Sequence, residues 1–400
     1  MSRVPVVCGW VVSSLSGWGV YGLNLAQQWA NDADLRVMFT QIASDALQID
    51  PLRGLGLLGI IRESAELERK LSSKDGHELA LPGLVIHAIG NALRSSASTA
   101  CERIKANAHV AAVFFEDTEF NAEARARADK FELIVAGSSW NADVLRGSGI
   151  DHTSLVPQGI DPTLFHPAPR SRMFGDRFLI FSGGKLEPRK GQDLVLTAFK
   201  LFAARHPEAM LITAWHSPWP KLALAFDSEH RLAPIRFDER GYIDVVRWAV
   251  DSGLKASQVF DIGFVSNWVM PTVLREMHAA LFMNRCEGGT NLVAMECMAC
   301  GVPTILSANT GHLDLLRDGA ARALVRQGKP RPPLGIRGFD GWGESDIDEA
   351  VAALEAIYAD RAAAAETGQR GAALLSGMNW AHQTGLLKDA VRPFLQRAMV

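Results

Sequence analysis

The chain has 400 residues, more than one ordinary hydrophobic core holds, which predicts two domains. Hydrophobic residues make up 48% and charged residues 21%, a globular balance, and no uncharged apolar run is long enough to span a membrane. The net charge of −3 excludes an overall basic field that would draw the protein to nucleic acid. Five cysteines without disulfide-like spacing, and no secretion-type leader, favour a cytoplasmic location.

Short apolar runs alternate with helical patterns in the first part of the chain. Helical patterns cover 21–30 and 123–131. Buried strands are expected at 4–12, 35–42, 81–89, 109–115 and 133–137. Such alternation is typical of parallel strands joined by crossover helices.

The sequence GWGVYG (17–22) follows the first strand and satisfies the G-x-G-x-x-G pattern of dinucleotide-binding loops. An NAD-linked oxidoreductase is therefore one alternative function. Bulky Trp18 would obstruct a pyrophosphate, and the second strand ends without an acid for the ribose, because Asp45 lies several residues beyond it. The simpler interpretation places Gly17 and Gly19 in a flexible loop at a helix N-terminus that lines the binding cleft.

The stretch 51–71 mixes apolar and basic residues. This pattern is typical of a helix that lies on a membrane surface, but packing within the fold explains it equally well. Peripheral contact with the inner face of the membrane therefore stays open beside the cytoplasmic location.

The alternation begins again after the proline-marked stretch 161–170, which we interpret as a linker. A helix is expected at 191–206, and strands are expected at 177–184, 209–215, 258–265, 278–285 and 302–308. We therefore expect an α/β protein with domains at 1–168 and 169–377, the helical tail 378–400 returning to the first. Two Rossmann-like domains facing a cleft are the expected architecture.

The sequence FSGGKLEPRKG (181–191) combines the end of a strand, two glycines and a group of cations. Gly184 ends the strand, and Lys185, Arg189 and Lys190 precede a helix. A strand–loop–helix junction of this kind can place both lysines against one diphosphate. A solvated basic turn is the simpler interpretation, and the neighbouring motif decides against it.

That motif is RCEGGTNLVAMECMACG (285–301), again a strand, a loop and a helix. Gly288 and Gly289 let backbone N–H groups approach an anion at the helix N-terminus. Thr290 or Asn291 can cap the helix, and Leu292 faces the core. Glu296 lies one turn in, from where its carboxylate can reach back and accept hydrogen bonds from a ribose.

Cys297 and Cys300 suggest a metal site, and Glu287 with Glu296 suggests an acid/base pair. A zinc site usually needs four ligands, and the sequence offers no second cysteine pair. We therefore interpret the cysteines as buried small hydrophobic residues. An acid/base role suits Glu296 poorly if it holds a ribose.

These motifs resemble those of retaining GT-B glycosyltransferases of family 4, and the resemblance runs through almost the whole chain. VAGSSWNADVLRGSGIDHTSLVPQGIDPTLFHP (135–167) is similar to the family's signature before the linker. GGKLEPRKG resembles its diphosphate motif, and CEGGTNLVAMECMACGVPTI resembles its E-G-x-G segment. Asn379 and Trp380 lie where the family often has a tryptophan at the start of its returning helix.

The resemblance implies a transferase for glycan biosynthesis that uses a UDP- or GDP-sugar and retains the anomeric configuration. It implies a glycan, lipid-linked or protein acceptor on the first domain, and no cofactor or metal, so that Asp346 and Asp348 need no metal role. Ser345 with Asp348 is then expected to cap a helix. The implied catalytic residues are Glu116, Lys185, Lys190 and Glu287. The implied donor-binding residues are Gly17, Gly19, Gly184, Gly288, Gly289, Thr290, Asn291, Leu292 and Glu296.

The chain departs from the family pattern in three places. Lys185 stands where arginine is usual, and the two glutamates are nine positions apart instead of eight, which adds a residue to the glycine loop. Glu116 stands where many members have histidine, with His87 as the fallback contact to the reacting sugar. The first two departures keep a second alternative open, a protein of this fold that binds a nucleotide sugar without transferring it.

Overall fold

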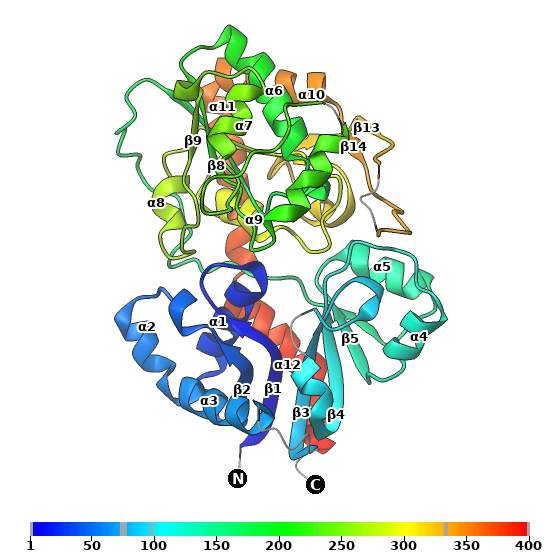
Figure 1. Ribbon diagram of the computed structural model, residues 1–400. Coiled ribbons are helices and arrows are strands. Elements are labelled where there is room, and N and C mark those ends of the chain that lie inside the picture. Colours follow the sequence, from blue (N-terminus) through cyan, green and yellow to red (C-terminus); the bar gives the residue numbers. More distant parts are fainter. Residues whose placement is uncertain (1–2, 73–77, 97–98, 230, 332–334, 398–400) are drawn as a thin grey trace. The chain divides into compact units, whose positions relative to one another are not determined.

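The computed structural model describes residues 3–72, 78–96, 99–229, 231–331 and 335–397. The chain divides into two compact units, coloured along the sequence in Figure 1. Unit 1 comprises Met1–Asp161, Ser266–Trp268 and Met378–Val400, and unit 2 comprises Pro162–Val265 and Val269–Gly377. The first boundary thus lies before the expected position 168, at the isoleucine–aspartate pair that precedes the linker prolines.

Unit 1 is built on a parallel sheet of six strands in the order β2-β1-β3-β4-β5-β6. The strands are β1 Val4–Val12, β2 Leu35–Ile42, β3 Leu79–Ile89, β4 Ile104–Val113, β5 Leu133–Ala136 and β6 Thr153–Leu155. The helices are α1 Gly17–Trp29, α2 Pro51–Gly56, α3 Leu58–Ser72, α4 Ala122–Ala128, α5 Ser139–Gly147 and α12 Trp380–Arg397. The C-terminal helix α12 packs on unit 1, where the rings of Trp380 and Tyr21 stack with centroids 5.4 Å apart.

Unit 2 contains a second parallel sheet of six strands, in the order β12-β11-β10-β7-β8-β9. The strands are β7 Phe178–Gly183, β8 Ala209–Ala214, β9 Val259–Asp261, β10 Ala279–Phe282, β11 Thr304–Ser307 and β12 Arg322–Leu324. The helices are α6 Gln192–Arg205, α7 Val245–Asp251, α8 Met270–Leu274, α9 Leu292–Ala299, α10 Ile347–Ala359 and α11 Arg361–Gly377. A separate antiparallel pair consists of β13 Gln327–Gly328 and β14 Glu344–Ser345.

The buried central strands explain why the apolar runs form parallel sheets. Every residue of β7, β10 and β11 is buried, which requires helices on both faces of the sheet. The chain runs from β7 through β8 to β9 on one side and then returns to β10 on the other. The adjacent strands β7 and β10 therefore form the topological switch point, where open α/β sheets bind their ligands at the carboxyl ends of the strands.

The N-terminus of α10 differs from the sequence-based expectation. The expected cap Ser345 is wrong, because Asp346 caps α10 and accepts a hydrogen bond from the N–H of Glu349 at 2.8 Å. Ser345 Oγ instead accepts a hydrogen bond from Gln327 Nε2 at 2.9 Å. No helix in the described ranges is both long and apolar enough to cross a membrane.

Candidate functional site

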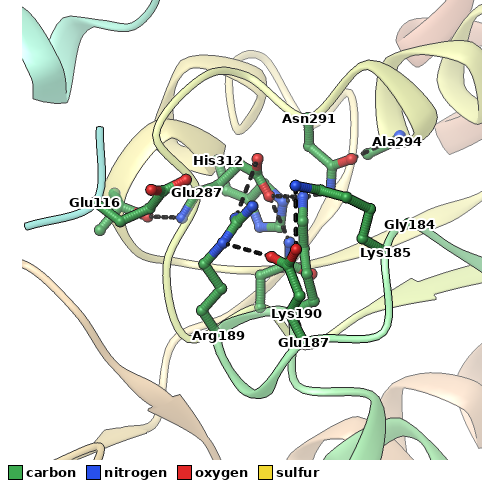
Figure 2. A network of polar contacts seen from close by, with 12 residues as sticks. Glu116, Gly184, Lys185, Glu187, Arg189, Lys190, Glu287, Asn291, Ala294 and His312 are labelled. Carbon is green, nitrogen blue, oxygen red and sulfur yellow. Dashed lines mark hydrogen bonds and ion pairs between the residues drawn. The ribbon is translucent and has the colours of Figure 1, made fainter. Parts of the chain in front are cut away.

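The site is built on the loops after β7 and β10, which leave neighbouring strands at the switch point of unit 2. Residues 184–191 follow β7 and residues 283–291 follow β10. Figure 2 shows the polar side chains of these two loops directed toward one another. The structure thus brings together the two motifs that the sequence singled out separately.

Glu187 binds two of the three cations in the first loop. Its Oε1 lies 3.0 Å from Lys185 Nζ, and its Oε2 lies 3.0 Å from Arg189 Nε (Figure 2). Burial alone would raise the pKa of Glu187, but the charges of Arg189 and Lys185 outweigh it and lower the pKa. Lys185 also lies 5.0 Å from the centre of the exposed Trp219 ring. The first loop therefore holds its cations in place before any ligand arrives.

Lys190 and Glu287 form an ion pair that joins the two loops. Asn284 Nδ2 donates to the same carboxylate oxygen at 2.7 Å, and Arg189 Nη1 lies 3.8 Å from the other oxygen. Burial alone would raise the pKa of Glu287, but Lys190 and Arg189 lower it to about 2. Burial also lowers the pKa of Lys190. We take the charged pair as the resting state, because the surrounding donors all favour the carboxylate.

The glycine loop, residues 286–291, is buried and leads into α9. Of the two expected caps, Asn291 is the one used, since its side chain accepts from the N–H of Ala294 at 3.4 Å. Thr290 Oγ1 instead contacts Met295 Sδ at 2.9 Å. Leu292, 9% exposed, and Glu296, 4% exposed, are buried in α9 as expected for a core residue and an inward carboxylate.

Cys297 and Cys300 are buried, unbridged thiols, which confirms their interpretation as packing residues. Burial raises the pKa of both, that of Cys300 to about 12, so neither is a thiolate near neutral pH. In the ranges that the structure describes, no three His, Cys, Asp or Glu residues gather as a metal site.

Arg285 holds the loop after β7 in place through hydrogen bonds to several partners. Its guanidinium binds Asp193 with two hydrogen bonds of 2.8 and 2.7 Å, and its Nε donates to Glu344 at 2.7 Å. Nη1 also donates to Pro188 O at 2.7 Å, and the backbone N–H donates to Arg189 O at 2.8 Å. Arg285 thereby fixes the turn that carries Arg189 and Lys190.

In unit 1, Gly17 and Gly19 do not lie in a flexible loop, so that expectation is wrong. Both belong to the first turn of α1, where Ser16 Oγ accepts from the N–H of Gly19 at 3.1 Å. A Cβ atom on Gly19 would lie 2.0 Å from Ser13 Oγ, so glycine is needed for packing. Trp18 packs against the rings of Trp10 and Phe114, with centroids 5.4 and 4.9 Å away. This aromatic packing leaves no room for a pyrophosphate at the start of α1. The NAD-linked alternative is therefore not favoured.

Glu116 and His87, the two candidates for contact with the reacting sugar, both belong to unit 1. The N–H of Glu116 donates to Asn91 Oδ1 at 2.7 Å, just beyond β4. His87 Nε2 lies 3.0 Å from His109 Nδ1 inside the sheet, and burial lowers the pKa of His87 to about 4. His87 is half-buried between the rings of His109 and Phe131, which suits a packing residue of the sheet.

Three residues of the site escaped the sequence analysis: Glu187, Thr310 and His312. Glu187 had a signal, since it lies between Lys185 and Arg189 in the diphosphate motif. Thr310 and His312 come from the turn after β11 and contact the glycine loop across about twenty positions of sequence. Only the parallel sheet, which places β11 beside β10, brings them there.

Comparisons with known proteins agree with this architecture. Residues 177–332, most of unit 2, match the family model "Glycosyl transferases group 1". A GDP-mannose-dependent alpha-(1-6)-phosphatidylinositol monomannoside mannosyltransferase from Mycolicibacterium smegmatis is 24% identical over 82% of this chain and 69% of its own length. Two further curated relatives align over 44% and 51% of their own lengths, so the chain spans about half of them.

Solved structures with the same fold cover nearly the whole chain. A sucrose-phosphate synthase from Thermosynechococcus elongatus superposes with a TM-score of 0.67 at 16% identity, over 98% of this chain and all of its own. The Anabaena protein Alr3699/HepE, solved in complex with UDP-glucose, superposes with a TM-score of 0.63 at 13% identity and the same coverage. The fold is therefore GT-B, and residues 177–332 of the chain match the glycosyl transferases group 1 model.

Proposed function

We propose that the protein is a glycosyltransferase that moves a sugar from a UDP- or GDP-sugar to an acceptor hydroxyl, with retention of configuration and without a metal. The observation that carries this proposal is the cluster of Lys185, Arg189 and Lys190 around Glu187 and Glu287 at the switch point of unit 2. The cluster lies inside the segment that matches the group 1 model. A relative that uses GDP-mannose and a neighbour solved with UDP-glucose support a nucleotide-sugar donor of either base.

In the proposed reaction the bond from the anomeric carbon to the diphosphate breaks while a bond to the acceptor oxygen forms on the same face. The acceptor proton passes to the leaving diphosphate, so no enzyme nucleophile is needed. Lys185, Arg189 and Lys190 would neutralise the charge that develops on the diphosphate, with the N-terminus of α9 adding its dipole. Because side chains supply this positive charge, the reaction as proposed needs no divalent cation.

The carboxylates would hold the neutral parts of the donor. A bound diphosphate would take Lys190 from Glu287, which leaves Glu287 free to accept hydrogen bonds from the sugar hydroxyls. Glu296 would accept from the ribose diol, and the backbone of the glycine loop would contact the phosphates. Glu116 is proposed to contact the transferred sugar or the acceptor hydroxyl, and Gly184 to shape the donor site.

We propose a cytoplasmic protein whose acceptor is a glycan, a lipid-linked sugar or a protein. A lipid-linked acceptor is supported by three exposed leucines on α2 and α3 that would suit peripheral membrane contact: Leu52, Leu55 and Leu58 are 78%, 64% and 49% exposed. Sedimentation with anionic vesicles should fall for the Leu52→Ser/Leu55→Ser variant. Equal sedimentation of both proteins would contradict membrane contact through these helices.

The donor site is tested by calorimetric titration of UDP, GDP and their sugars into the wild-type protein and the Lys190→Ala and Glu296→Ala variants. Each variant should lose roughly ten- to a hundred-fold in affinity, because a hydrogen bond to a charged group contributes about 1.5–3 kcal/mol. Lys130→Ala, which removes an exposed cation of unit 1, is the matched control and should bind normally.

The outcomes separate the alternatives. Unchanged affinity in both variants would show that the site is assigned wrongly. A wild-type protein that binds a nucleotide sugar but neither transfers nor hydrolyses it would be a binding protein, not an enzyme. Thermal unfolding of each variant accompanies the titrations, and the Lys190→Met/Glu287→Leu double variant avoids an unpaired buried charge if Lys190→Ala does not fold.

A further inference from the structure

The turn Thr310–Leu315, which follows β11, lies directly against the glycine loop. The N–H of Glu287 donates to Thr310 Oγ1 at 2.8 Å, and the N–H of Gly311 donates to Glu287 O at 3.0 Å. A Cβ atom on Gly311 would lie 1.8 Å from Gly289 O, so only glycine permits this approach. The turn therefore sets the path of the first half of the loop.

His312, in the same turn, holds the second half of the loop through Asn291. The side-chain amide nitrogen Nδ2 of Asn291 lies 3.0 Å from His312 Nε2 (Figure 2). His312 is fully buried. Asn291 has a left-handed backbone, with φ at 64° and ψ at 85°, which costs energy for a residue other than glycine. The contact with His312 therefore stabilises Asn291 in a conformation that its backbone does not favour.

The protonation of His312 follows from its partner. Asn291 Oδ1 already accepts from the N–H of Ala294, so Nδ2 is the atom that faces the imidazole. An amide nitrogen only donates, so Nε2 of His312 must accept and the ring is neutral. Burial, which lowers the pKa of His312 to about 4, agrees with a neutral ring at physiological pH.

We infer that His312 is a positioning residue of the donor site, acting through Asn291 on the first turn of α9 and the glycine loop. The inference rests on the proposed function, because it assigns to His312 the geometry of the loop that would bind the diphosphate sugar. Asn291 has a left-handed backbone, and so has Thr310, two residues before His312. Backbone strain of this kind persists where the surrounding structure holds it, and it gathers at functional sites.

A purely structural role accounts less well for the same residues. A buried apolar side chain at position 312 would fill the space without the cost of desolvating an imidazole. A glycine at position 291 would take the left-handed backbone without strain. The chain has instead a donor and an acceptor that fit each other, and the bond between them fixes the orientation of the cap on α9.

The test measures the dissociation constants of UDP, GDP and their sugars for the wild-type protein and a set of variants. His312→Ala should weaken binding by about tenfold, the effect of one lost buried hydrogen bond. His312→Gln, which offers a neutral acceptor of similar reach, should restore most of the affinity. Asn291→Gly keeps the left-handed backbone but lacks the amide, and its loss should not add to that of His312→Ala in the double variant.

Leu315→Ala is the matched control, because Leu315 is fully buried on the same turn. It should lower the melting temperature and leave nucleotide affinity unchanged. Equal affinity losses for Leu315→Ala and His312→Ala would overturn the inference, as would normal binding by His312→Ala beside impaired binding by Lys190→Ala. If His312→Ala does not fold, Asn291→Gly decides in the same way. A wild-type protein that binds none of the nucleotides would instead refute the proposed function.

Discussion

Two junctions of this chain join a strand to a helix through glycines, and they are built differently. At β1–α1 the glycines lie inside the helix, Ser16 caps it, and Trp18 covers it with an aromatic cluster. At β10–α9 the glycines precede the helix, a left-handed Asn291 caps it, and Glu287 binds Lys190 from the neighbouring loop. The comparison teaches that glycine spacing alone does not identify an anion site. The proposed anion site at β10–α9 is supported instead by the charges that flank its glycines and by those on the loop of the adjacent strand.

The largest expected effect concerns the buried ion pair of Arg285 and Asp193, which supports the second junction. Arg285→Met should lower the free energy of unfolding by about 3 kcal/mol, because it removes both guanidinium hydrogen bonds of the buried Asp193 and leaves only Arg231, whose Nε lies 3.4 Å away. Denaturant titration measures this loss. Arg247→Met, which breaks the exposed pair with Asp251, should cost under about 1 kcal/mol. Similar values for the two variants would mean that the junction does not depend on its buried charges.

Acid should destabilise both units through neutral histidines, the buried His312 at the second junction and the half-buried His87 in the sheet of unit 1. Burial lowers the pKa of each to about 4. At His312 the charge of Glu287 opposes this effect and that of Lys190 supports it, and at His87 the neighbouring His109 supports it. Between pH 6.5 and about pH 4 these histidines are protonated in the unfolded chain but stay neutral in the folded chain. The free energy of unfolding therefore falls as the pH drops through this window, and above pH 6.5 the histidines do not change it. His312 should cost about 3 kcal/mol over this window, at about 1.4 kcal/mol per pKa unit, and the half-buried His87 should cost less.

The pH dependence is measured as the free energy of unfolding at a series of pH values. His312→Gln and His87→Gln should each make the fall in the free energy of unfolding at acid pH shallower, because each removes one histidine that takes up a proton in the unfolded chain. A decline as steep in the variants as in the wild type would show that these rings are not held neutral.

The smallest expected effect concerns the first junction. Ser16→Ala should lower the free energy of unfolding by about 1 kcal/mol, the usual cost of a lost helix cap. Nucleotide affinity is the sharper readout, since a junction built only for packing should bind no phosphate. A loss of donor affinity in Ser16→Ala would remove the contrast between the two junctions and would support the donor-site role of Gly17 and Gly19.

The sequence predicted the sheets well because fully buried strands are continuous apolar runs. The observed β11, Thr304–Ser307, lies inside the expected 302–308, and the observed β7, Phe178–Gly183, lies inside 177–184. The edge strands β6 and β12 were not predicted, because three residues carry too little pattern. The cap of α10 was misplaced by one residue, since Ser345 and Asp346 are both good caps and only the path of the chain decides between them.

The candidate site was predicted as a set of residues but not as a set of contacts. Lys190 and Glu287 were both expected near a diphosphate, yet their mutual pairing depends on β7 and β10 being neighbours in the sheet. His312 lay outside every motif, and its partner Asn291 was expected only as a cap. Side-chain pairing across a sheet edge follows from topology and register, which one sequence without an alignment indicates only coarsely.

The pairing of Lys190 with Glu287 has a consequence for selectivity. Lys185, Arg189 and Lys190 face Glu187 and Glu287, so the charges of these side chains nearly cancel at a distance. We expect little long-range steering of anions and a weak dependence of association on ionic strength. A bare phosphate would have to displace Glu287 from Lys190 and would leave it only Asn284 and Arg189 as partners, whereas a ligand that also brings hydroxyl groups would give that carboxylate new hydrogen bonds. Because Glu287 already occupies Lys190, we expect the site to bind simple anions more weakly than ligands that carry both phosphate and hydroxyl groups.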